Sequence, residues 1–171
     1  MQSMAAFVRI SSGMRTAAIE LSQICNDIRI LVSGPRTGFG ELVIPAVQPG
    51  SSIMPGKVNP AIAEMVNQVC FQVIGNDTAV AWGAQAGQLE LNVMMPGINY
   101  AVCLSATIFG NAVRQLREKT VEGMRVDEER CKELMDLSPS LIDVATEEKV
   151  MDEAKLRQVL DPLPMTKGGV Q

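Results

Sequence analysis

Apolar residues recur at intervals of seven along the first part of the chain. One series is Phe7, Met14, Leu21 and Ile28, and a second, offset by three residues, is Ile10, Ala17, Ile24 and Leu31. This spacing is typical of a helix that packs along its whole length on other helices. We therefore predict a long helix over residues 3–32, whose apolar seam is covered by neighbours in a bundle, including other subunits.

Two further segments, residues 60–82 and 98–118, carry a helical apolar pattern. The positions that mark their buried faces are Ile62, Val66, Val69, Val73 and Val80 in the first, and Ile98, Ala101, Ser105, Ile108, Ala112 and Leu116 in the second. Asn59 and Pro60 suit the N-cap and the first position of a helix, so we predict that the first of these helices begins there. Asn76 lies on the seam, where we expect it to fix the register of the helices or make a buried hydrogen bond rather than act in catalysis.

Residues 33–59, between the first two predicted helices, contain five Gly and four Pro. Both residue types interrupt helices, so this segment is predicted to be a loop. Loops of this length are uncommon in compact domains and are often functional. The sequence thus predicts an all-α fold, in which a bundle of long, near-antiparallel helices carries a long Gly/Pro-rich loop.

The chain becomes more charged after Glu118, which suggests a change of organisation. We expect residues 1–126 to form the central helical bundle with its loop, and residues 127–171 to form a small, incomplete C-terminal helical domain. Within that second part, short helices are predicted around residues 127–136 and 152–160.

Composition narrows the possible functions. A net charge of −4 argues against nucleic-acid binding, which needs a concentrated basic face. No apolar run is long enough for a membrane span, and the N-terminus lacks the pattern of a signal peptide. The chain has no histidine, and its four cysteines are widely spaced (Cys25, Cys70, Cys103 and Cys131). We therefore expect no metal site, and we read the cysteines as reduced, mostly buried thiols of a cytoplasmic protein.

The segment with candidate chemistry is residues 50–60, G-S-S-I-M-P-G-K-V-N-P. It is not a nucleotide-binding P-loop, because five residues separate Gly50 from Gly56 and Val58 follows Lys57. Open glycine amides, the charge of Lys57 and the amide of Asn59, beside a helix N-terminus, instead indicate an anion site. The alternative is a flexible surface turn with an exposed lysine.

These eleven residues resemble the signature of the fumarase/aspartase superfamily, and the resemblance extends over about residues 1–135. It includes I-C-N-D-I-R-I-L-V-S-G-P-R at the end of the first predicted helix and N-D-T-A-V from Asn76. Residues 66–77, V-N-Q-V-C-F-Q-V-I-G-N-D, and residues 84–94, A-Q-A-G-Q-L-E-L-N-V-M, look more like aspartase than class II fumarase.

The resemblance implies roles for individual residues of this loop. Ser51 would be the general base that removes a proton beside a substrate carboxylate, giving an aci-carboxylate from which ammonia leaves to form fumarate. Ser52 and the loop backbone would bind the same carboxylate, and Lys57 and Asn59 would hold the carboxylate ends of the substrate. The loop-backbone residues concerned are Gly50, Ile53, Met54 and Gly56. No cofactor or metal is implied.

The resemblance also implies incompleteness. Members of the family are much longer and build each site from segments of three subunits, so we expect an ammonia-lyase fragment that is active on L-aspartate only within a larger protein. The complete protein would be a homotetramer with shared sites, acting on a small dicarboxylate or amino acid, with no nucleic-acid or membrane partner. The alternatives are a class II fumarase and a catalytically inactive helical oligomerisation module that keeps the loop.

Overall fold

The computed structural model describes residues 2–34, 36–48, 50, 53–54, 58–137, 145–149, 152 and 155. The chain divides into two compact units, Met1–Asp127 and Glu128–Gln171. The first unit contains the helices α1 (Ala5–Leu31), α2 (Ala61–Gln85) and α3 (Met95–Lys119), the strands β1 (Leu42–Val43) and β2 (Arg125–Val126), and a 3₁₀ turn at Val121–Gly123. The second contains α4 (Glu128–Leu137) and a short helical stretch at residues 145–147.

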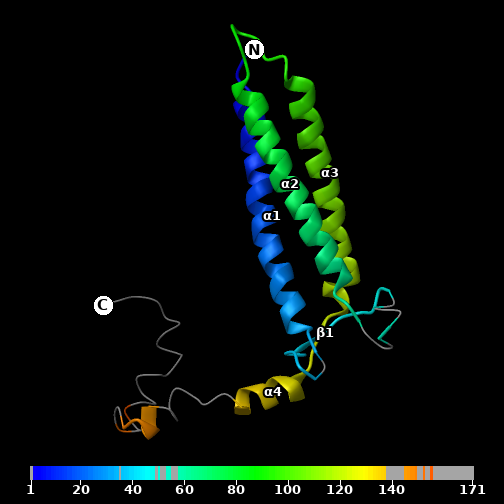
Figure 1. Ribbon diagram of the computed structural model, residues 1–171, viewed down its shortest axis with the longest axis vertical. Coiled ribbons are helices and arrows are strands. Elements are labelled where there is room, and N and C mark those ends of the chain that lie inside the picture. The colour runs from blue at the N-terminus through cyan, green and yellow to red at the C-terminus, as the bar shows by residue number, and fades with distance from the viewer. Residues whose placement is uncertain are drawn as a thin grey trace. The chain divides into compact units, whose positions relative to one another are not determined.

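The three long helices of the first unit lie side by side and alternate in direction (Figure 1). The middle helix in the chain, α2, makes extensive contacts with both α1 and α3, whereas α1 and α3 touch each other less. The predicted all-α bundle is therefore confirmed, with helix boundaries that differ from the prediction by one to three residues. For example, α2 continues through Gly83, where a Cβ atom would lie only 2.9 Å from Cγ1 of Ile98. The missing side chain lets α3 approach α2 closely.

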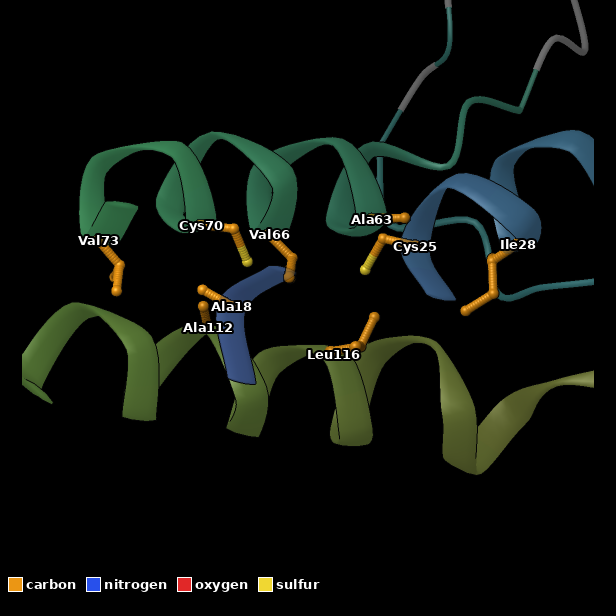
Figure 2. Close-up of a cluster of buried hydrophobic side chains, with 9 residues drawn as sticks. All are labelled: Ala18, Cys25, Ile28, Ala63, Val66, Cys70, Val73, Ala112 and Leu116. Carbon is orange, nitrogen blue, oxygen red and sulfur yellow. The ribbon is translucent and has the colours of Figure 1, made fainter. Parts of the chain in front are cut away.

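Small and β-branched side chains fill the core between these helices. Figure 2 shows the main cluster, which is built from Ala18, Cys25, Ile28, Ala63, Val66, Cys70, Val73, Ala112 and Leu116. A second cluster at the other end of the bundle consists of Met4, Val80, Ile98 and Ala101. All of the predicted seam positions of α2 and α3 are buried or partly buried, because the 3.6-residue period brings them to one face of each helix.

The two apolar series of α1 have different environments. The series from Phe7 to Ile28 is buried or partly buried within the unit, whereas Ile10 and Ile24 of the second series are 56% and 53% exposed. Because α2 and α3 cover one side of α1, the second series faces away from the bundle. Part of the predicted seam of α1 is thus left without cover in the single chain.

Polar side chains also join the helices. Asp77 of α2 is 6% exposed and forms an ion pair of 3.3 Å with Arg15 of α1. The predicted hydrogen bond of Asn76 is present, since its Nδ2 donates to the Oγ of Ser105 on α3 at 2.9 Å. Within the described part of the chain, no buried side-chain nitrogen or oxygen lacks a partner.

A small antiparallel strand pair, which was not predicted from the sequence, anchors the loop between α1 and α2. Leu42 of β1 is opposite Val126 of β2, and Val43 is opposite Arg125. The backbone N–H of Asp127 also donates to the carbonyl of Glu41 at 2.9 Å. These contacts fix the middle of the loop to the segment that follows α3.

Candidate functional site

A cleft of about 580 Å³ lies where the C-terminal end of α1, the N-terminal end of α2 and the anchored loop meet. The described residues that line it include Arg29 and Val32 from α1 and its end, Leu42 from β1, Asn59 and Glu64 at the start of α2, and Asp127 after β2. The predicted functional loop ends at this cleft, because Val58, Asn59 and Pro60 form part of its wall.

Asn59 holds the two ends of the predicted catalytic segment together. Its Nδ2 donates to the carbonyl of Gly50 at 2.8 Å, in a partly buried position. The prediction that Asn59 caps α2 with its side chain is wrong: α2 begins at Ala61, Pro60 occupies the cap position, and no side-chain cap is formed. The amide of Asn59 is directed instead to the loop, where it closes the segment from Gly50 to Asn59.

Half of the predicted site residues can be placed. Gly50 and Asn59 are brought together, the Ile53 side chain is 86% exposed, and that of Met54 is half exposed. The other four predicted residues, Ser51, Ser52, Gly56 and Lys57, lie outside the described residues. The role assigned to each of the eight therefore stays a prediction.

Charged side chains at the cleft were not predicted from the sequence. The Nε of Arg29 lies 3.9 Å from Oε1 of Glu64, and both side chains are nearly half exposed. Such solvated pairs contribute little to stability. Among the described lining residues, Arg29 is the one cation, whereas Glu64 and Asp127 carry carboxylates. Asp127 lies at the cleft because it directly follows β2, which pairs with β1. The local sequence does not predict this pairing.

The four cysteines are free, as predicted, but only two of them, Cys25 and Cys70, are buried; Cys103 is exposed and Cys131 is intermediate. Burial is the main reason why the pKa of Cys25 rises from 9.0 to about 11, and it also raises the pKa of Cys70. Over the described ranges, no three His, Cys, Asp or Glu side chains come together in a way that could hold a metal ion. Nor is any helix in those ranges long and apolar enough to cross a membrane.

Comparison with known proteins connects this arrangement to a family. The family model described as Lyase matches residues 1–75. The chain is 42% identical over 188 residues to an aspartate ammonia-lyase of Helicobacter pylori, in an alignment that covers 94% of this chain and 40% of the relative. It is 52% identical over 139 residues to an aspartate ammonia-lyase of Pseudomonas fluorescens, covering 81% of this chain and 29% of the relative.

Solved structures show the same relationship. A structure described as fumarate lyase:delta crystallin from Brucella melitensis, in native form, superposes with a TM-score of 0.80 at 47% identity, covering 91% of this chain and 36% of that one. A class II fumarase from Schistosoma mansoni gives a TM-score of 0.82 at 36% identity, covering 96% and 34%. The chain thus spans at most about 40% of the length of these curated relatives. With this identity and this shared fold, the chain belongs to the lyase family that contains the aspartases and class II fumarases.

Proposed function

We propose that this chain contributes the catalytic loop of an ammonia-lyase that converts L-aspartate to fumarate and ammonia. The observation that carries the proposal is the agreement among its relatives: proteins 36–52% identical over most of this chain are aspartate ammonia-lyases. The position of Asn59 and Val58 on the wall of the cleft supports it, since the segment with the family signature then ends where a small substrate could bind.

In this proposal Ser51 is the general base. Its alkoxide takes a proton from the carbon next to a substrate carboxylate, and the electron pair of the broken C–H bond moves into that carboxylate to give an aci-carboxylate. The electrons then return to form the carbon–carbon double bond, and the C–N bond breaks to release ammonia. A serine can act in this way only where nearby positive charge and N–H groups stabilise both its alkoxide and the dianion.

The other residues of the loop would supply that stabilisation. Ser52 and the backbone of Gly50, Ile53, Met54 and Gly56 would bind the carboxylate that becomes the dianion. Lys57 and Asn59 would hold the carboxylate ends of the substrate. An asparagine amide has two N–H groups and one oxygen. The hydrogen bond from Asn59 to the Gly50 carbonyl uses one N–H group. The other N–H group and the oxygen would bind substrate while this bond closes the loop.

We further propose that the active protein is a cytoplasmic homotetramer with sites shared between subunits. Large apolar side chains on the outer faces of the bundle support the assembly, since stripes of this kind favour association. They include Ile10 and Ile24 on α1, Phe71 and Trp82 on α2, and Tyr100 on α3, all more than half exposed. Free thiols throughout the described chain are in keeping with a reducing compartment.

The test is made in a chimera in which this chain replaces the matching segment of the Helicobacter pylori relative. Ser51→Ala should reduce turnover of L-aspartate by about 10²–10⁴-fold, the usual cost of losing a general base, with no loss of helix content. Lys57→Ala should mainly raise KM, because it removes a charge that pairs with the substrate in the ground state as well as the transition state. Ser12→Ala is the control, since its hydroxyl bonds only to the Arg9 carbonyl in α1. Near-normal turnover by Ser51→Ala would show that another group takes the proton.

A class II fumarase is the second candidate, because the Schistosoma mansoni enzyme shares the fold at 36% identity. The same chimera separates the two. Fumarate absorbance and ammonium release with L-aspartate support the ammonia-lyase, whereas fumarate formed from L-malate alone supports the hydratase. Turnover of neither substrate by a folded assembly would favour the inactive oligomerisation module.

A further inference from the structure

A chain of polar side chains runs from the interface of α1 and α2 to the cleft. Ser22 Oγ donates to Oδ1 of Asn67 at 3.0 Å, and Nδ2 of Asn67 donates to Oδ1 of Asn26 at 2.8 Å. The same oxygen of Asn26 accepts from Nη1 of Arg29 at 3.3 Å. Asn67 is 4% exposed, while Arg29 stands at the cleft with nearly half of its side chain in solvent. These hydrogen bonds therefore link the buried amide of Asn67 to Arg29, the one cation among the described residues that line the cleft.

The direction of each hydrogen bond in this chain follows from Arg29. A guanidinium can only donate, so Asn26 must turn its oxygen toward Arg29. Because that oxygen also faces Asn67, Asn67 must present its NH₂ group to Asn26 and its own oxygen to Ser22. Every member has a single consistent orientation, and only an amide at position 67 can both donate to Asn26 and accept from Ser22 in this way.

Holding Arg29 in place has an electrostatic consequence at the cleft. Glu64 and Asp127 put two carboxylates in the lining of the cleft, and a substrate with two carboxylates would be repelled by them. Arginine is long and flexible, and half-exposed arginine side chains keep much of their rotamer freedom unless a bond fixes them. A guanidinium fixed beside Glu64 offsets part of that negative charge.

We propose that Asn67 is a positioning residue, which acts through Asn26 to hold the Arg29 guanidinium at the cleft. The effect on an anionic substrate rests on the function proposed above, whereas the ordering of Arg29 does not. Asn67 itself touches no substrate in this proposal. It sets the orientation of Asn26, and Asn26 supplies the acceptor that Arg29 needs.

Two isosteric substitutions should have opposite effects. Asn67→Asp removes the NH₂ donor and would set the Asn26 oxygen against a carboxylate. The Asn26 amide should therefore rotate and present its NH₂ group, which takes the acceptor away from Arg29 and releases it. Asn26→Asp keeps an acceptor toward both Asn67 and Arg29 and adds a charge that attracts the guanidinium. Asn26→Leu removes the acceptor at an exposed helical position and so releases Arg29 without burying a charge.

The experiment is side-chain NMR of the full chain labelled with ¹⁵N-arginine, with the Nε–H signal of Arg29 identified by its loss in Arg29→Lys. In the unchanged chain and in Asn26→Asp, this signal should be dispersed and rigid. In Asn67→Asp and Asn26→Leu, its chemical shift should move to the averaged position, and its relaxation to the mobile behaviour, of the exposed Arg114 side chain. Asn76→Asp is the matched control, because it makes the same exchange on α2 in a separate network with Ser105. A rigid Arg29 signal in Asn67→Asp or in Asn26→Leu, or a mobile one in Asn26→Asp, overturns the proposal.

A kinetic measurement tests the consequence for substrate. In the active chimera, Asn67→Asp and Asn26→Leu should raise KM for L-aspartate several-fold with little change in kcat, and the increase should shrink at high salt, which screens the carboxylates. A purely structural loss would not depend on salt in this way. Should the chimera fail to convert aspartate, the proposed function falls, and the NMR result still decides whether Asn67 positions Arg29.

Discussion

Val66→Ala is the sharpest test of where the core lies. Val66 has no exposed surface and sits at the centre of the main cluster, on the face of α2 that meets the other helices (Figure 2). The substitution deletes two methyl groups, worth about 1.6 kcal/mol of transfer free energy at about 0.8 kcal/mol each. A cavity of at least methyl size adds about 1 kcal/mol. We therefore expect the free energy of unfolding to fall by about 2–3 kcal/mol.

Val113→Ala on α3 provides the matched control, because Val113 is 42% exposed. Both substitutions exchange valine for alanine inside a long helix, so both gain the same few tenths of a kcal/mol in helix propensity. The difference between the two variants then reports burial alone. Urea unfolding followed by circular dichroism at low protein concentration measures it, and Val113→Ala should change the stability by less than about 0.5 kcal/mol.

Equal losses in the two variants would refute this reasoning about the core. A Val113→Ala loss that grows with protein concentration has a different meaning, since it would place that face of α3 in a contact between chains. A Val66→Ala loss below about 0.5 kcal/mol would show that Val66 is not packed in the core in solution.

Three further predictions concern charge, thiols and assembly. Arg15→Met leaves the buried Asp77 carboxylate without its ion-pair partner and should lower the free energy of unfolding by about 1–3 kcal/mol, measured by thermal or urea unfolding. The double variant Arg15→Met/Asp77→Asn removes both charges and should lose less. Burial raises the pKa of Cys25 to about 11 and also raises the pKa of Cys70. The stability that the two buried, protonated thiols contribute is therefore complete below pH 9 and should be lost as the pH rises toward 11. A urea unfolding midpoint that does not fall between pH 9 and 11 contradicts this prediction. Ile24→Glu should weaken the proposed tetramer in sedimentation velocity, since it places a charge in an exposed apolar series, and an unchanged association state would exclude that face from the interface.

The helices could be predicted because their information is local. The helical spacing of apolar residues predicts the buried positions of α2 and α3, and it identifies both apolar series of α1. It could not say which series of α1 packs inside the chain, since that depends on which neighbours belong to the same chain. The start of α2 was misassigned for a related reason: the Asn59 amide has two possible partners, and only the folded loop offers the carbonyl of Gly50.

Much of the candidate site depends on contacts between distant segments. The loop was recognised from its motif, but the cleft beside it brings Arg29, Glu64 and Asp127 together from three parts of the chain. The strand β1 has only two residues, too few to show an alternating pattern. Its pairing with β2, and hence the place of Asp127, follows from the packing of the helices.

The β1–β2 pairing also bears on the order in which the molecule assembles. The antiparallel helices α2 and α3, which a short connection joins, make contacts near in sequence that form early because little chain has to be closed. The strand pair joins residues on either side of both α2 and α3, so the bundle must be in place before the two strands can meet. We expect the segment that leads to Gly50 to settle late in folding, and to be among the first parts to open again as stability falls. A chain that has not finished folding would therefore display its helices before it could present a formed cleft.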